Sequence, residues 1–103
     1  MVIISQDKTM ILNFEYIETI KRGNPLENND GKFKILCDTT SDNQYTIAEY
    51  EKEERAKEVL QQIACRYSLE EIYKRANSKT QEELTRNYVE IKIIPYIFEM
   101  PER

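Results

Sequence analysis

One apolar stripe between residues 50 and 67 constrains the fold of this chain more than any other feature. Six apolar residues in it recur at the spacing of one face of an α-helix: Ala56, Val59, Leu60, Ile63, Ala64 and Tyr67. Glutamates fill the first turns and Arg66 lies in the last turn, which suits the helix macrodipole. Because a helix of this length is marginal alone in water, the stripe must pack on the β-rich segments around it.

The segments before this helix have strand patterns separated by polar turns. Five runs alternate or cluster β-branched and aromatic residues, namely residues 2–4, 10–12, 14–20, 32–38 and 44–50. Residues 5–9 and 39–43 are polar turns, and residues 23–31 hold both glycines of the chain and form a loop. The short connection at 39–43 predicts an antiparallel hairpin.

The segment after the helix leaves two structures open. Ser68 to Glu71 matches a capping box, which predicts a helix start, and a second apolar stripe follows: Leu69, Ile72, Tyr73 and Ala76. The two stripes are out of phase. The chain therefore forms either a kink near Tyr67 and Ser68 or one long helix whose apolar face winds around its axis.

The last part of the chain predicts one more short helix and a closing β-segment. Thr80 to Glu83 is another capping box, which opens a helix to about Asn87. Residues 88–100 predict one or two strands interrupted at Pro95, which has no amide hydrogen for a ladder. The expected fold is α+β, with an antiparallel sheet of five or six strands packed against one long or two shorter helices. We expect residues 1–103 to form a single domain, because a chain of this length can bury one hydrophobic core.

Composition excludes several classes of function. The net charge of −4 argues against a partner that is a nucleic-acid polymer or a membrane surface, since such binders carry a basic excess. No apolar run is long enough to span a membrane, and the N-terminus lacks a signal-peptide pattern, so we expect a cytoplasmic protein.

The residue types also argue against catalysis. The chain has no histidine, two cysteines and two glycines, which removes most nucleophilic triads, zinc sites and glycine-rich phosphate loops. The paired glutamates lie in the first turns of expected helices, where capping and the macrodipole account for them. We expect a protein that is not an enzyme and that has neither a metal nor a cofactor.

A binding role is indicated by the tyrosines and the basic residues. The chain has seven tyrosines, and the segment from Arg66 to Lys92 interleaves them with basic and amide side chains. Tyrosine can stack on a base and hydrogen-bond a phosphate, and arginine forks match phosphate oxygens. The same segment carries five glutamates, so a solvated face with core tyrosines is the alternative to a pocket for a small phosphorylated ligand.

Three short motifs resemble a family of small phage and prophage proteins of Gram-positive bacteria. They are Ile3-Ile4-Ser5-Gln6-Asp7-Lys8, Glu49-Tyr50 with the run from Glu53 to Leu60, and the ending from Phe98 to Glu102. In size and order of elements the chain is similar to the Thoeris anti-defence sponges within that family. The motifs cover about a third of the chain and look structural, so they carry over no ligand contact.

The resemblance implies a function. Such sponges bind the cyclic ADP-ribose isomer made by TIR-domain immune proteins and sequester it without degrading it, and related members take up cyclic oligonucleotides. They form homodimers or higher homo-oligomers with pockets between subunits. By type and position, Tyr67 would stack on adenine, Asn77 would hydrogen-bond it, and three arginines would contact phosphates: Arg22, Arg75 and Arg86.

A protein-binding inhibitor is the rival hypothesis. An anti-CRISPR-like protein could use its acidic surface to occupy the nucleic-acid channel of a bacterial defence effector, and the net charge suits this role. Its activity would depend on exposed glutamates such as Glu51, Glu54 and Glu58. A small adaptor or virion-associated protein without a ligand is a third alternative.

Overall fold

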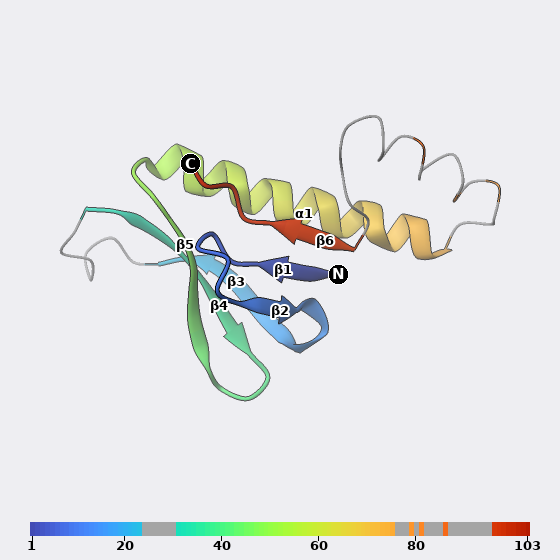
Figure 1. The fold of residues 1–103 in the computed structure, drawn as a ribbon, viewed down its shortest axis with the longest axis horizontal. Coiled ribbons are helices and arrows are strands. Elements are labelled where there is room, and N and C mark those ends of the chain that lie inside the picture. The colour runs from blue at the N-terminus through green and yellow to red at the C-terminus, as the bar shows by residue number, and fades with distance from the viewer. Residues whose placement is uncertain (24–30, 76–78, 80, 82–85, 87–95) are drawn as a thin grey trace.

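One long helix lies across two small β-sheets in the computed structural model of the chain (Figure 1). The structure describes residues 1–23, 31–75, 79, 81, 86 and 96–103. The elements in chain order are β1 (Val2–Ile4), β2 (Ile11–Asn13), the 3-10 helix η1 (Phe14–Tyr16), β3 (Ile17–Arg22), β4 (Phe33–Thr39), β5 (Gln44–Tyr50), α1 (Glu53–Arg75) and β6 (Ile97–Glu99). The predicted α+β class is confirmed.

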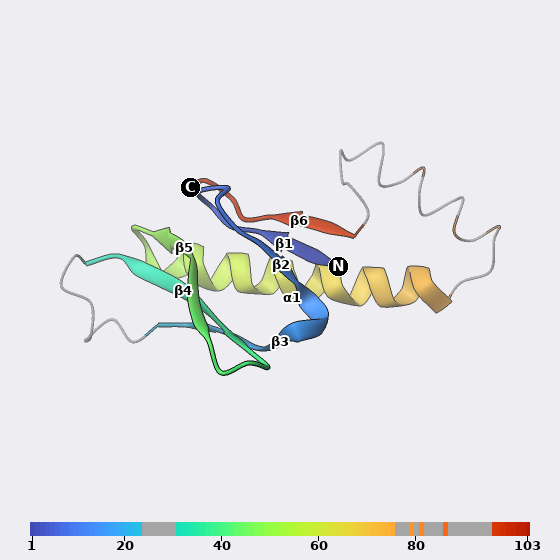
Figure 2. The same ribbon diagram turned by 60° about the horizontal axis from the view of Figure 1, so that its bottom comes forward.

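The two sheets have three strands each. The first has the order β2-β1-β6, with β1 antiparallel to β2 and parallel to β6. The second has the order β3-β4-β5 and is antiparallel throughout. A register shift between Ile35 and Leu36 marks a bulge in the pairing of β4 with β5. Figure 2 shows α1 running along both sheets.

The prediction of one antiparallel sheet is wrong, because two features of the chain divide the strands. Residues 14–16, expected in a strand, form η1, and the side chain of Asn13 caps it by accepting from the Glu15 backbone N–H at 3.1 Å. This turn separates β2 from β3 and leads them into different sheets. β6 pairs parallel to β1 because it returns after a long connection that includes α1, as parallel neighbours require.

The helix after residue 50 is one continuous element, the second of the two alternatives. It begins at Glu53 rather than at Tyr50 and continues through Ser68 to Arg75. The capping box at Ser68 is therefore wrong: the hydroxyl of Ser68 donates to the Ala64 carbonyl oxygen at 3.1 Å, the bond of a serine inside a helix. The predicted helix at 80–87 and the strand at 88–95 lie outside the described residues, apart from Gln81 and Arg86.

The face of α1 that packs on the sheets matches the predicted stripe only in its first half. Ala56, Val59 and Ile63 are buried in the core as expected. Ala64 and Tyr67 are exposed instead of buried. The core as a whole gathers apolar residues of α1, of both sheets and of the C-terminal tail: Ile3, Ile35, Cys37, Ile47, Ala48, Tyr50, Ala56, Val59, Ile63, Phe98 and Met100.

The second half of α1 buries an ion pair where the sequence predicts apolar residues. The side chains of Arg66 and Glu70 are 10% and 2% exposed, and Nε of Arg66 lies 3.4 Å from Oε1 of Glu70. Arg66 donates to the Ile97 carbonyl oxygen at 2.9 Å. The same Glu70 oxygen accepts from the Tyr96 backbone N–H at 2.6 Å. Polar contacts therefore join this half of the helix to the start of β6.

Candidate functional site

A hollow of about 750 Å³ lies beside the start of α1. In Figure 1 the C-terminal tail, which supplies part of its lining, runs next to the first turns of this helix. Four cationic side chains line the hollow: Lys32, Lys52, Arg55 and Arg103. The lining also includes Gln6, Tyr50 and three acidic side chains: Glu49, Glu51 and Glu102.

Gln6 joins three of the segments that line the hollow. Its backbone N–H donates to the Ile47 carbonyl oxygen at 2.9 Å. Its side-chain amide donates to the carbonyl oxygens of Glu49, Pro101 and Glu102 at 3.0, 3.2 and 3.0 Å, and its side-chain oxygen accepts from the Glu49 backbone N–H at 2.9 Å. Gln6 thus links the turn after β1, the end of β5 and the C-terminal tail.

A tight turn holds Gln6 in this position. One carboxylate oxygen of Asp7 accepts from the hydroxyls of Ser5 and Thr9, each at 2.7 Å, and from the Thr9 backbone N–H at 3.0 Å. Lys8 adopts a positive φ of 62° in this turn. The hydrogen bonds from Thr9 and then Ser5 lower the pKa of Asp7 below its usual value, since they favour the charged carboxylate.

Tyr50 and Arg55 form the wall of the hollow nearest the core. Tyr50 is 3% exposed, and its hydroxyl donates to the Pro101 carbonyl oxygen at 2.7 Å. Burial raises the pKa of Tyr50 to about 12, against the opposing charge of Arg55, so this phenol stays neutral at ordinary pH. The guanidinium carbon of Arg55 lies 6.0 Å from the centroid of the Tyr50 ring, and its Nε donates to the Arg103 carbonyl oxygen at 2.7 Å.

The charges around the hollow are unequally paired. Glu49 lies 4.0 Å from Lys32 and 3.8 Å from Lys34, so two cations share this acid. Glu102 lies 3.7 Å from Lys8. Lys52 is exposed and makes no ion pair of 4.0 Å or less with another residue in the described part of the chain.

The start of α1 adds a partial positive charge to this region. The first backbone N–H groups of a helix have no partner within the helix, and its macrodipole is positive at this end. Lys52 precedes the first turn of α1 and Arg55 lies in it, although Glu53 and Glu54 lie in the same turn and Arg55 pairs with Glu58 at 2.9 Å. The arrangement can bind an anionic group with Lys52, Arg55 and the helix N-terminus.

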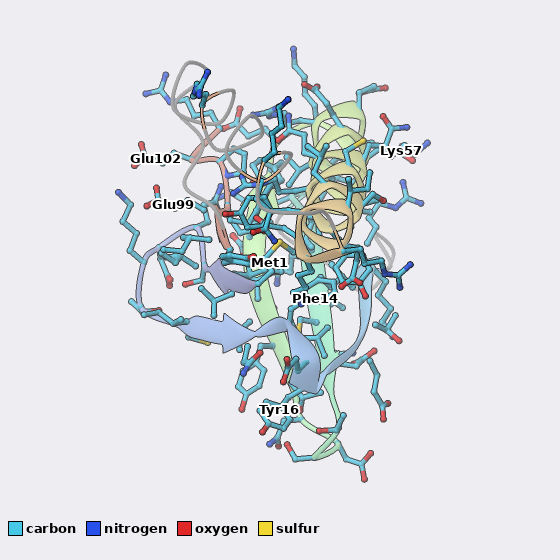
Figure 3. All side chains as sticks on the ribbon, turned by 90° about the vertical axis from the view of Figure 1, so that its right-hand side faces the viewer. Met1, Phe14, Tyr16, Lys57, Glu99 and Glu102 are labelled. Carbon is cyan, nitrogen blue, oxygen red and sulfur yellow. The ribbon has the colours of Figure 1, made fainter. Side chains whose placement is uncertain are left out.

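The residues predicted from the resemblance lie elsewhere on α1 and β3. Arg22, at the end of β3, makes an ion pair with Glu53, the first residue of α1. Tyr67 is 41% exposed and stacks on Phe14, with ring centroids 4.8 Å apart and ring planes at 25°. Figure 3 shows Phe14 beside the helix, whereas Tyr16 points away from it.

Three further predicted residues belong to the end of α1 or follow it. Arg75 is its last residue, with a side chain that is 83% exposed and lies 3.8 Å from Glu71. Arg86 is exposed, and Asn77 lies outside the described residues. Because a helix rises 1.5 Å per residue, Glu53 and Arg75 lie about 33 Å apart along α1. One chain therefore does not bring Arg22 and Arg75 together.

The chain matches no protein-family model, no curated protein and no solved structure. Its site must therefore be interpreted from its own residues.

Sequence reasoning missed Gln6, Lys52 and Arg55 as residues of a site, although the motifs contained a signal. The opening motif includes Gln6, the second motif includes Arg55, and the ending includes Pro101. These three segments are far apart in the sequence, and in the structure they meet around the hollow.

Among the described residues, no group of three or more cysteine, aspartate or glutamate side chains could hold a metal ion. No helix in the same part of the chain has the length and apolar character needed to cross a membrane.

Proposed function

We propose that this protein is a non-enzymatic sponge that binds and sequesters a cyclic nucleotide immune signal during phage infection. The ligand is a cyclic ADP-ribose isomer or a cyclic oligonucleotide. One observation carries the proposal: the three segments that resemble the phage protein family meet around a hollow lined by four cationic side chains.

The size and charge of the hollow support a phosphorylated ligand of this class. Small-molecule sites usually have volumes of roughly 300 to 1,000 Å³, and this hollow has about 750 Å³. Arg55 already donates through Nε to the Arg103 carbonyl oxygen and through Nη1 to Glu58, so it offers Nη2 to a phosphate oxygen, and Lys52 offers an ammonium. Gln6 acts as a structural link, since its amide is already bonded to three carbonyl oxygens.

Self-association belongs to the same proposal. The resemblance implies homodimers or higher homo-oligomers with pockets between subunits. In such an assembly the exposed Tyr67 and Arg75 of one copy, with Asn77 and Arg86, would complete the site of a second copy. The exposure of the Tyr67 ring and the Arg75 side chain supports this role.

A thermal shift experiment tests the ligand. The purified protein is heated with a panel of cyclic ADP-ribose isomers and of cyclic di- and trinucleotides, because a ligand that binds only the folded state raises the melting temperature by mass action. Linear ADP-ribose and AMP serve as controls for nonspecific phosphate binding. No shift with any member of the panel contradicts the proposal.

A matched pair of charge reversals locates the binding site. Lys52→Glu reverses a charge in the hollow, and Lys74→Glu makes the same reversal near the other end of α1, where Lys74 lies 3.7 Å from Glu71. Binding at the hollow predicts that Lys52→Glu abolishes the thermal shift and that Lys74→Glu keeps it. The opposite result would move the site to the second half of the helix, with Tyr67.

A second candidate function has its own observation. Glu51, Glu54 and Glu58 are all exposed near the start of α1, as an acidic mimic of nucleic acid requires. A protein-binding inhibitor would lose activity in a triple glutamine variant of these residues and would keep it in Lys52→Glu. Mass spectrometry of small molecules released from the purified protein separates the two functions, because only a sponge carries a bound nucleotide.

A further inference from the structure

The second half of α1 buries two charged side chains and exposes two aliphatic ones among its polar residues, which is unusual for a surface helix. Its inward face buries Arg66 and Glu70. Its outward face exposes Leu69 and Ile72, which are 37% and 56% accessible to solvent, together with Cys65. Exposed aliphatic side chains grouped on one helix indicate a surface that contacts a partner.

The exposed residues follow a heptad spacing. Six residues recur at intervals of three and four along one outward line, which we call the outer stripe: Glu58, Gln61, Cys65, Ser68, Ile72 and Arg75. All six are exposed, and Leu69 flanks them. The stripe lies on the side of α1 opposite its buried residues, which are Ala56, Val59, Ile63, Arg66 and Glu70. This spacing keeps all six positions on the side of α1 that a second helix would contact.

The order of charges along the outer stripe fits a second copy running in the opposite direction. With a two-fold axis between positions 66 and 67, Glu58 faces Arg75 of the other copy, Gln61 faces Ile72, and Cys65 faces Ser68. Each contact occurs twice, as in an isologous interface. A parallel pair would instead place Glu58 against Glu58 and Arg75 against Arg75. Antiparallel helices also oppose their macrodipoles favourably.

We propose that a second copy of this chain docks on the outer stripe to form an antiparallel α1–α1 homodimer. The occupant is another copy because the stripe is complementary to itself in charge when reversed. The inference rests on the proposed self-association and names its surface, but it does not require the proposed ligand. Oligomeric state and ligand binding are therefore measured separately.

Charge swapping tests the contact between copies through the double variant, because each single variant also breaks a pair within its own helix: Glu58 lies 2.9 Å from Arg55, and Arg75 lies 3.8 Å from Glu71. Glu58 and Arg75 are 17 positions apart, about 26 Å along the helix, so they cannot pair within one chain. Sedimentation velocity over a wide range of protein concentration measures self-association. Glu58→Arg and Arg75→Glu are each expected to weaken it about tenfold or more, because each brings like charges together across the interface. The double variant, Glu58→Arg with Arg75→Glu, is expected to restore it.

Two apolar substitutions complete the experiment. Ile72→Asp places a charge in the outer stripe and is expected to abolish the dimer. Ile11→Asp is the matched control, since Ile11 is 72% exposed on β2 and lies outside the stripe. Circular dichroism checks that each variant is folded. A wild-type chain that is monomeric at every concentration overturns the inference, and so does a dimer that survives Ile72→Asp or a double charge swap that fails to restore association.

The outcomes separate this inference from the proposed function. A monomer whose melting temperature still rises with a cyclic nucleotide overturns only the docking surface. A dimer that follows the charge swap but shifts with no ligand overturns only the sponge.

Discussion

The two halves of α1 are held to the sheets by different forces. In the first half, Ala56, Val59 and Ile63 are buried among apolar residues of the core. In the second half, Arg66 and Glu70 occupy the inward positions and bond to the backbone at the start of β6. The free energy gained by burying apolar side chains depends little on their orientation. A buried ion pair is favourable only when its two groups are held in a fixed geometry.

The difference explains where the candidate sites lie. The first half is fixed by the core and by the hydrogen bond from Arg55 to the Arg103 carbonyl oxygen of the C-terminal tail, so it can support a preformed hollow. The second half uses its polar residues for internal contacts and leaves Leu69 and Ile72 on the outside. This difference supports the proposed anion site at the start of α1 and the proposed helix contact on the outer stripe.

The largest expected effect comes from breaking the buried ion pair. Glu70→Ala leaves the Arg66 guanidinium without its carboxylate and the Tyr96 backbone N–H without its acceptor. Removing one partner of a buried pair costs about 3–5 kcal/mol. Urea unfolding, followed by circular dichroism, measures this loss.

The control for this experiment removes both charges. Arg66→Met combined with Glu70→Leu replaces the pair with apolar side chains and should cost less than Glu70→Ala, because no charge is left buried alone. A loss below about 1 kcal/mol for Glu70→Ala would show that the second half of α1 is not anchored by this pair.

A smaller loss is expected from the polar link at the first half. Gln6→Ala removes the side-chain hydrogen bonds to Glu49 and to the carbonyl oxygens of Pro101 and Glu102. Each hydrogen bond contributes about 0.5–1.5 kcal/mol, and water can replace the exposed ones. The free energy of unfolding should therefore fall by about 2 kcal/mol. Ligand binding at the hollow should also weaken, since the tail then keeps the Tyr50–Pro101 hydrogen bond to β5 but loses the bonds through Gln6. Equal ligand binding by Gln6→Ala and wild type would show that the hydrogen bonds of Gln6 do not support the ligand site.

Sequence patterns predicted the elements whose signals are local. The strands at 2–4 and 44–50 have the predicted boundaries, because alternation and adjacent polar turns specify them within a few residues. The existence of a helix through residues 56–63 follows from its period for the same reason. The division into two sheets was missed, because it depends on η1, whose Phe14 and Tyr16 also suit a strand.

Two features could not be predicted from local sequence patterns: the candidate site, and which face of the second half of α1 is buried. Arg66 and Glu70 are buried because the backbone of Tyr96 and Ile97 supplies their partners, about 30 positions along the chain. Helical periodicity ranks such charged residues as exposed, so it selected Tyr67 for the core. Similarly, Lys52 and Arg55 resemble ordinary residues of a helix start until the tail is placed beside them.

Alkaline pH should weaken the first half of the helix through Tyr50. Its pKa rises from 10.0 to about 12 on burial, so the unfolded chain loses this proton before the folded chain does. Stability is fully present below pH 10.0 and is lost as the pH rises toward about 12, at a slope of up to about 1.4 kcal/mol per pH unit. Tyr50→Phe should remove this component of the slope, at a cost of about 1 kcal/mol at neutral pH for the lost bond to Pro101. Identical pH slopes in urea unfolding of wild type and Tyr50→Phe would contradict the assignment.

The smallest expected effect is at the outside of the second half. Ile72→Gln removes an aliphatic side chain that is 56% exposed and touches no core cluster. In dilute solution, where the chain is monomeric, its unfolding free energy should change by less than about 0.5 kcal/mol. Ile63→Ala, at a buried position of the same helix, should lose about 2–5 kcal/mol under the same conditions. A large loss for Ile72→Gln would mean that Ile72 packs within its own chain, and the outer stripe would then offer a second copy no apolar residue except Cys65, with Leu69 beside it.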